Sequence, residues 1–128
     1  MMVVDTSALV AIMRGEPEAK ACTALIEAEP ELLISAGTLA EAMVLATLRG
    51  WRRQLAALFE QVTFDIIPVT AASARRVGDI YARWGKGIHP ASLNYGDCFA
   101  YELAESRGCK LLFTGSDFSR KDIPPALA

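Results

Sequence analysis

The chain has few of the residues on which many small proteins depend for cross-links or acid and base chemistry. It contains three cysteines, Cys22, Cys98 and Cys109, and a single histidine, His89. An odd number of cysteines without a Cys-x-x-Cys pair argues against a disulfide framework and against a zinc knuckle. We therefore expect buried thiols of structural use. His89 precedes Pro90, and we interpret it as a loop or hydrogen-bonding residue, because one histidine cannot act as both general acid and general base.

Long apolar runs and an excess of one charge are also absent. No segment approaches the roughly 18 uninterrupted apolar residues of a membrane span. The opening Met-Met-Val-Val-Asp has no basic residue before its apolar stretch, which argues against a secretory signal and for a cytoplasmic protein. Thirteen Lys and Arg against fifteen Asp and Glu give a net charge of -2, so any polyanionic partner must meet a local basic patch.

What the chain does have is a regular alternation of two periodicities. Its 128 residues, 52% of them apolar, predict one domain over residues 1–128. Short apolar runs predict strands at residues 2–4, 32–34, 66–69 and 111–113. Helical spacing predicts helices at residues 7–13, 17–28, 38–48, 51–61, 71–84 and 94–106. This alternation predicts an α/β fold with a mainly parallel central sheet covered by helices on both faces.

Four acidic residues occupy unusual places in this pattern. Asp5 follows the first predicted strand directly, and Asp117 follows the last one by a short Thr-Gly-Ser turn. Glu41 and Asp97 lie in the first turns of two predicted helices. Each of these two shares a face with apolar residues at helical spacing, which predicts that both point inward; those residues are Val44, Leu45 and Leu48 for Glu41, and Ala100, Tyr101 and Ala104 for Asp97.

The four acids are expected to converge, because strand carboxyl ends and the helix starts that follow them open on one edge of a parallel sheet. Their mutual repulsion and desolvation would cost several kcal/mol if nothing offset them. A bound cation would offset this cost. Ligands that offer only oxygen favour Mg²⁺ or Mn²⁺.

Helix capping is an alternative explanation for two of these acids. Thr38-x-x-Glu41 fits a capping box, and Asn94-x-x-Asp97 is a looser version of the same motif. Acids in a first turn are also favoured by the helix dipole. Capping does not explain why Asp5 and Asp117 stand at strand ends in the same chain, so the set of four favours a shared site.

Four motifs together resemble a known family. They are Val3-Val4-Asp5-Thr6-Ser7-Ala8, the Glu41 helix, Leu93-Asn94-Tyr95-Gly96-Asp97-Cys98-Phe99-Ala100-Tyr101, and Leu111-Leu112-Phe113-Thr114-Gly115-Ser116-Asp117-Phe118. In order and spacing they resemble the PIN-domain ribonucleases, specifically the VapC-type toxins of type II toxin-antitoxin pairs, over nearly the whole chain. The resemblance implies a three-layer sandwich and a Mg²⁺-dependent endoribonuclease, with Mn²⁺ as a substitute.

The same resemblance assigns roles to individual residues. Asp5, Glu41, Asp97 and Asp117 match the acidic metal-binding quartet of the family, with Asp5 and Asp97 as the most direct ligands. Beside them are hydroxyl residues that would orient carboxylates or water, or act as plain caps: Thr6, Ser7, Thr114 and Ser116. Asp122 is a possible fifth acid. The resemblance also implies an RNA substrate, a cognate antitoxin protein and a homodimer.

The residues themselves point to the same chemistry. The chain has no Gly-rich phosphate loop and no Ser-His-Asp ordering, so water activated by a metal is the remaining nucleophile. Basic residues that could attract phosphates are Arg14, Arg49, Arg52, Arg53, Arg75, Arg76 and Lys86. Two alternatives remain. A phospho-receiver domain would need an acid after the strand at residues 66–69, where Thr70 stands, and a catalytically silent interaction domain would not need the quartet.

Overall fold

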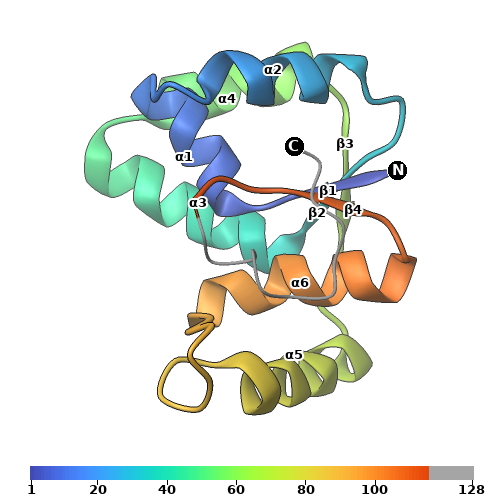
Figure 1. Ribbon diagram of the computed structural model, residues 1–128. Helices are drawn as coiled ribbons and strands as arrows, with labels where there is room; N and C mark the ends of the chain where they lie inside the picture. Colours follow the sequence, from blue (N-terminus) through green and yellow to red (C-terminus); the bar gives the residue numbers. More distant parts are fainter. Residues whose placement is uncertain (116–128) are drawn as a thin grey trace.

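A parallel sheet of four strands organises the protein, whose computed structural model describes residues 1–115 (Figure 1). The strands are β1 (Met2–Val4), β2 (Leu32–Ser35), β3 (Phe64–Ile67) and β4 (Lys110–Leu112). Their order across the sheet is β3-β2-β1-β4, and all three neighbouring pairs are parallel. The first strand in the chain therefore lies inside the sheet, between two strands that follow it.

Six helices of the described chain form the outer layers. They are α1 (Thr6–Arg14), α2 (Ala19–Ala28), α3 (Ala36–Arg49), α4 (Arg52–Gln61), α5 (Ala71–Trp84) and α6 (Tyr95–Arg107). Helices α1 to α4 lie on one side of the sheet and α5 and α6 on the other, so the predicted three-layer α/β architecture is confirmed (Figure 1). Within residues 1–115, no helix combines the length and the apolar character that crossing a bilayer requires.

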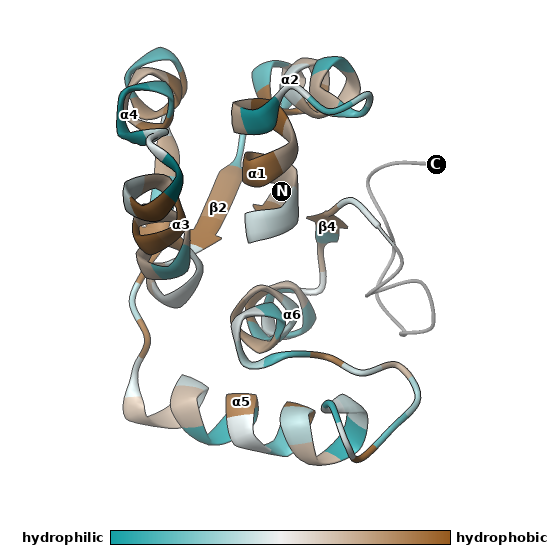
Figure 2. Ribbon diagram, turned by 90° about the vertical axis from the view of Figure 1, so that its left-hand side faces the viewer, coloured by the Kyte–Doolittle hydropathy of each residue, from teal (hydrophilic) through white to brown (hydrophobic). Residues whose placement is uncertain are grey.

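Alternate strand residues supply two separate cores. Met2 and Val4 point into the core formed with α1 to α4, whereas Val3 between them points into the core formed with α5 and α6. This is the side-chain alternation of a strand with both faces covered. Figure 2 shows β2 in the colour of hydrophobic residues. The uninterrupted apolar run at residues 2–4 is therefore what a central parallel strand requires.

The third strand begins two residues before the predicted range of 66–69. It pairs with β2 from Phe64 to Ile67, and the Phe64 ring stacks on Phe59 of α4 with centroids 4.5 Å apart. Pro68 has no N–H to give to a ladder, which favours the end of the strand before it. The aromatic anchor and the proline explain the shift.

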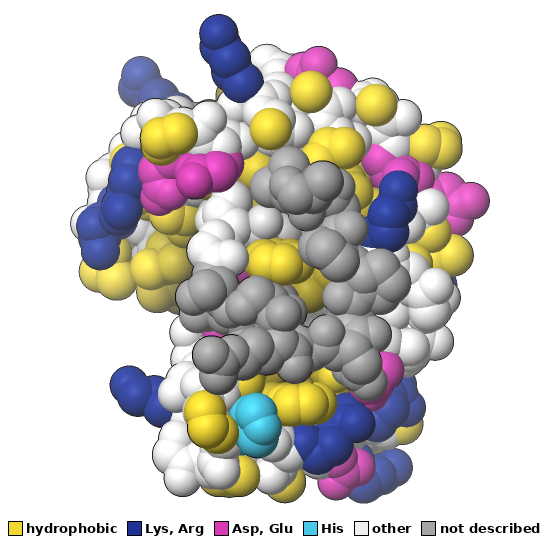
Figure 3. All heavy atoms as spheres, viewed as in Figure 1, with side chains coloured by type: hydrophobic (Ala, Val, Ile, Leu, Met, Phe, Trp, Pro, Cys, Tyr) yellow, Lys and Arg dark blue, Asp and Glu magenta, His cyan; other side chains and the backbone are white. Residues whose placement is uncertain are grey.

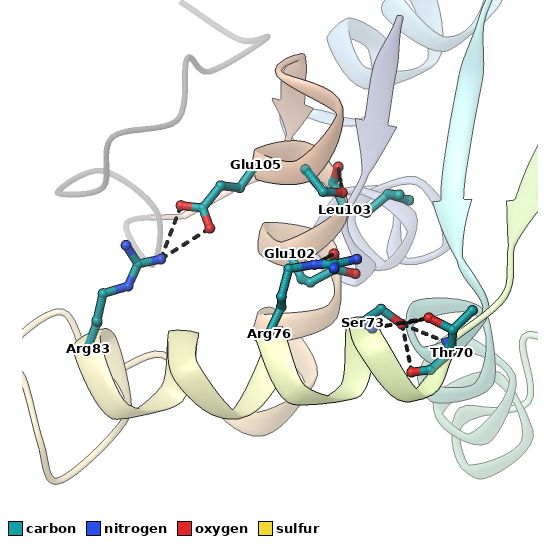
Figure 4. A network of polar contacts seen from close by, with 8 residues as sticks. Thr70, Ser73, Arg76, Arg83, Glu102, Leu103 and Glu105 are labelled. Carbon is teal, nitrogen blue, oxygen red and sulfur yellow. Dashed lines mark hydrogen bonds and ion pairs between the residues drawn. The ribbon is translucent and has the colours of Figure 1, made fainter.

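Polar contacts fasten α5 to α6 on the outer side of the molecule (Figure 4). Arg76 donates from Nε to the nearly buried Glu102 carboxylate at 3.0 Å. Arg83 donates to both oxygens of Glu105 at 3.1 and 3.2 Å, about two turns further along α5 and one turn further along α6. These two pairs hold the outermost helix against α6, which itself packs on the sheet.

Candidate active site

The carboxyl edge of the sheet carries a small open cavity of about 250 Å³. Its walls come from the end of β1, the first turns of α1 and α6, the second turn of α3, and the segments after α1 and β4. The lining residues are Asp5, Thr6, Ser7, Val10, Glu16, Glu41, Leu45, Asn94, Asp97 and Thr114. The structure thus brings Asp5, Glu41 and Asp97 to one cavity from distant parts of the chain.

Asp5 is the most deeply buried of these acids, with 1% of its surface exposed. Its backbone N–H donates to the Leu112 carbonyl of β4 at 3.0 Å, which fixes it at the strand end. Its Oδ2 accepts from Ser7 twice, from N at 3.0 Å and from Oγ at 2.6 Å, so Asp5 caps α1. Its Oδ1 is buried and has no hydrogen-bond partner among residues 1–115.

The environment of Asp5 disfavours its ionised form. Burial raises the pKa of the Asp5 carboxyl from 3.8 to about 6, and the nearby Glu41 carboxylate adds to the rise. The two Ser7 hydrogen bonds act in the opposite direction, because they stabilise the carboxylate. A buried acid with one orphaned oxygen beside a second acid is the arrangement that a bound cation would stabilise.

Ser7 and Thr114 join the first and last described strands at the site. The Ser7 hydroxyl donates to Asp5 and accepts from the Thr114 N–H at 3.0 Å, and the Thr114 hydroxyl donates to the Ser7 carbonyl at 3.3 Å. Of the two roles expected for Ser7, orienting a carboxylate or capping a helix, the structure shows the first: Ser7 orients the Asp5 carboxylate. Within residues 1–115, the hydrogen bonds of Thr114 go to Ser7 and not to a carboxylate.

Glu41 takes part in a contact between helices, and the capping explanation of this residue is wrong. Helix α3 begins at Ala36 with Ser35 as its cap, so Thr38 is already inside the helix. The Glu41 Oε1 accepts from the Thr6 hydroxyl at 2.6 Å, and the carboxylate lies against the backbone of Gly96 in α6. The Thr6 hydroxyl therefore orients the Glu41 carboxylate.

The prediction that Val44 and Leu48 lie on the inward face of α3 is also wrong. Val44 and Leu48 are 58% and 74% exposed, and the buried residues of this helix are Thr38, Ala42 and Ala46. Ala42 and Ala46 lie in the core that helices α1 to α4 form with the sheet. Glu41 reaches the cavity from the side of the helix, and Leu45 of the predicted set lines the cavity with it.

Asp97 serves as a helix cap and as a cavity residue at once. Its Oδ2 accepts from the Asn94 N–H at 3.1 Å, while the Asn94 side chain accepts from the Asp97 N–H at 2.9 Å. This is the reciprocal capping box considered from the sequence. The residue is 7% exposed, and Ala100, Tyr101 and Ala104 on its face are buried as predicted.

Two cavity residues, Glu16 and Asn94, do not stand out as site residues in the sequence. Glu16 looks like a solvated acid at a helix start, but Gly15 ends α1 in the left-handed conformation and turns the chain back, with Glu16 N donating to the Ala11 carbonyl. Arg14 lies 3.8 Å from Glu16 and 5.6 Å from the centre of the Trp51 ring. The Arg-Gly-Glu sequence after an apolar helix is the signal for this turn.

The cavity offers oxygen donors of the kind that Mg²⁺ or Mn²⁺ binds. Among residues 1–115, no three His, Cys, Asp or Glu side chains are arranged as ligands of one ion. Asp5 and Asp97, completed by water, are a ligand set of the size that Mg²⁺ uses, and the orphaned Asp5 Oδ1 supports the fit. Ser116, Asp117 and Asp122 lie outside the described residues. His89 does not line the cavity; its ring packs edge-on against Trp84 at 4.8 Å.

Comparisons with known proteins find sequence relatives and solved structures of similar fold. The model of the PIN domain family matches residues 2–124. The chain is similar to Ribonuclease VapC28 of Mycobacterium tuberculosis, at 42% identity over 98% of both chains, and to Ribonuclease VapC30 of the same organism, at 40% identity over 95% of both. A solved structure of similar fold is VapC20 of Mycobacterium tuberculosis, described as a sarcin-ricin loop cleaving toxin, with a TM-score of 0.77, 21% identity and 96% of each chain covered.

Proposed function

The chain belongs to the PIN domain family, among its VapC ribonucleases, and on this premise we propose that it is the endoribonuclease toxin of a toxin-antitoxin pair, with its active site at Asp5, Glu41 and Asp97. One observation carries the assignment. Three acids from β1, α3 and α6 line one cavity, and the most buried of them has an oxygen without a hydrogen-bond partner in residues 1–115.

PIN-domain ribonucleases depend on divalent metal ions, and Asp5 and Asp97 would hold Mg²⁺ or Mn²⁺ here, with Glu41 and Asp117 as further ligands. A divalent cation at this place would lower the pKa of a water molecule and offset the charge that develops on the phosphate oxygens. Ser7 orients Asp5 by occupying Oδ2, so Oδ1 is the oxygen that has no hydrogen-bond partner among residues 1–115. Thr6 holds Glu41 beside it, which places a second carboxylate where a water could be oriented.

RNA must approach this acidic cavity with its own negative charge. Arg14 stands beside the cavity residue Glu16, its side chain half exposed and held over the Trp51 ring. Lys and Arg side chains also gather with hydrophobic ones near the turn between α3 and α4 (Figure 3), where Arg49 and Arg52 are exposed. We assign these arginines to the RNA backbone, because guanidinium groups bind phosphate in a bidentate manner.

Two apolar grooves provide surfaces for the protein partners. A groove of about 570 Å³ between α3 and α4, which includes Met43, Leu55 and Phe59, fits the apolar side of an antitoxin segment near Trp51. A second groove of about 840 Å³ lies along α5 and the start of α6, where Val69 and Tyr95 are exposed, and would be covered in a homodimer. With an RNA substrate and an antitoxin as partners, we also propose a cytoplasmic location for the protein.

The proposal is tested by RNA cleavage with the purified chain in Mg²⁺, in Mn²⁺ and in EDTA. We expect hydrolysis that leaves a 5′-phosphate and a 3′-hydroxyl, because water attacks the phosphorus and the 3′ oxygen leaves with a proton. Asp97→Asn should remove the activity. Asp79→Asn, which changes an exposed acid of α5, should retain it. Cyclic phosphate products, or full cleavage in EDTA, would contradict the proposed mechanism.

A further inference from the structure

Helices α3 and α6 approach each other through a pair of glycines. Gly37 of α3 lies against the ring of Phe99 in α6, and Gly96 of α6 lies against the side chain of Glu41 in α3. In each case a Cβ on the glycine would overlap the partner side chain. Gly37 of α3 therefore accommodates the ring of Phe99, which lies three residues after Gly96 on α6. Gly96 accommodates the side chain of Glu41, which lies four residues after Gly37 on α3.

The two contacts differ in what they hold. The Gly37 contact receives an aromatic ring that is 9% exposed and belongs to the core on the α5 and α6 side. The Gly96 contact receives the carboxylate of Glu41, which lines the cavity. Gly96 itself directly precedes Asp97, another cavity residue. A methyl group at position 96 would overlap the Glu41 carboxyl carbon and both of its oxygens, so the carboxylate would have to move.

Glu41 is fixed from two sides. Thr6 at the start of α1 donates to Oε1 at 2.6 Å, and the Gly96 backbone limits the carboxylate on the α6 side. In this position the carboxylate keeps the Thr6 hydrogen bond and fills the space that a Cβ on residue 96 would occupy. A methyl group would overlap the whole carboxylate, so both oxygens would have to move, and the Thr6 bond to Oε1 would be lengthened or lost.

We propose that Gly96 is a positioning residue of the nuclease: the missing side chain leaves the space in which Thr6 holds the Glu41 carboxylate beside Asp5 and Asp97. This inference rests on the proposed function, since it assigns the glycine to the same site. A substitution of Gly96 is expected to affect the stability of the fold and the arrangement of the cavity acids to different extents. The end of a flexible glutamate can move without unfolding α6, whereas the cavity loses the arrangement of its acids.

The first test compares three glycine substitutions by thermal unfolding over a titration with Mg²⁺ or Mn²⁺. Gly96→Ala should fold and should weaken the apparent cation affinity by about tenfold or more, the range found when groups that orient ligands are changed. Gly78→Ala in α5, where a Cβ meets nothing within 4 Å, should leave that affinity unchanged. Gly37→Ala should lower the melting temperature of the metal-free protein more than Gly96→Ala does, because a ring in the core must move.

The second test places Gly96→Ala in a Glu41→Ala background and measures urea unfolding without metal. With the carboxylate removed, the added methyl has no overlap, so Gly96→Ala should be more favourable to stability there than in the wild type, and it should no longer change the cation affinity. Equal effects in both backgrounds would overturn the proposal. A wild type without any cation response would contradict the proposed metal site, while the metal-free cycle would still decide the role of Gly96.

Discussion

The burial of Asp5 makes a quantitative prediction about the metal-free protein. The pKa of this carboxyl rises from 3.8 to about 6 on folding. Below pH 3.8 the group is protonated in both states, and above pH 6 it is ionised in both. Between these values the native state holds a proton that the unfolded state has released, so stability falls as the pH rises. The difference in pKa corresponds to about 3 kcal/mol over the whole titration, most of which is lost between pH 4 and pH 7.

Asp5→Asn removes this titration while it keeps most of the local structure. The amide oxygen can accept the two Ser7 hydrogen bonds that Oδ2 accepts now. The amide nitrogen then replaces the orphaned Oδ1 and has no acceptor, which costs about 1 to 3 kcal/mol at every pH. We expect the variant to be less stable than the wild type at pH 4 and at least as stable at pH 7.5. The difference in melting temperature should change by roughly 10 °C across this range.

The assay is thermal or urea unfolding from pH 4 to pH 8 in EDTA, with Asp79→Asn of the exposed face of α5 as the matched control. The control removes one carboxylate without touching the cavity, so its curve should run parallel to that of the wild type. If the Asp5→Asn curve also runs parallel to the wild type, the carboxyl is not destabilised by burial, and the physical reason for a cation at this place is wrong.

Three further predictions follow from the same contacts. Apparent Mg²⁺ affinity, measured as the thermal shift, should fall by about tenfold per pH unit below pH 6, because the cation must displace the Asp5 proton; an affinity that is constant from pH 7 to pH 5 would contradict this. Ser7→Ala should raise the pKa of Asp5 further and move the loss of cation affinity to higher pH. Arg76→Ala should lower the free energy of unfolding in urea by about 1 to 2 kcal/mol, because it leaves the nearly buried Glu102 carboxylate without this ion pair. Arg83→Ala removes a more exposed ion pair and should lower it by less than about 1 kcal/mol.

The sequence was sufficient where a local pattern and the tertiary structure agree. The central strands are continuous apolar runs because both of their faces are covered, and the prediction of β1 is confirmed from Met2 to Val4. The start of β3 could not be found in the same way, because it depends on Phe64 stacking on Phe59 of another element. Asp5 and Asp97 could be placed at the sheet edge, because strand ends and helix starts are visible in the sequence.

Glu41 shows the limit of such predictions. Its spacing from Thr38 fits a capping box, yet the helix starts earlier, at a cap that β2 provides. The partners of its carboxylate, Thr6 and Gly96, lie far away in the chain on two other helices. A helical wheel cannot reveal either contact, because both depend on how three helix starts meet at the end of the sheet.

The central place of β1 in the sheet has a consequence for how the chain acquires activity. Met2 pairs with Leu32 on one side and with Lys110 on the other, so the sheet cannot close until most of the described chain is present. Contacts of such high sequence separation are slow to form, because a long loop must be closed before they can. A nascent or locally unfolded chain carries Asp5 and Glu41 but lacks the docked Asp97. Nuclease activity should therefore appear in step with the last folding event, and incomplete chains should be harmless to the RNA around them.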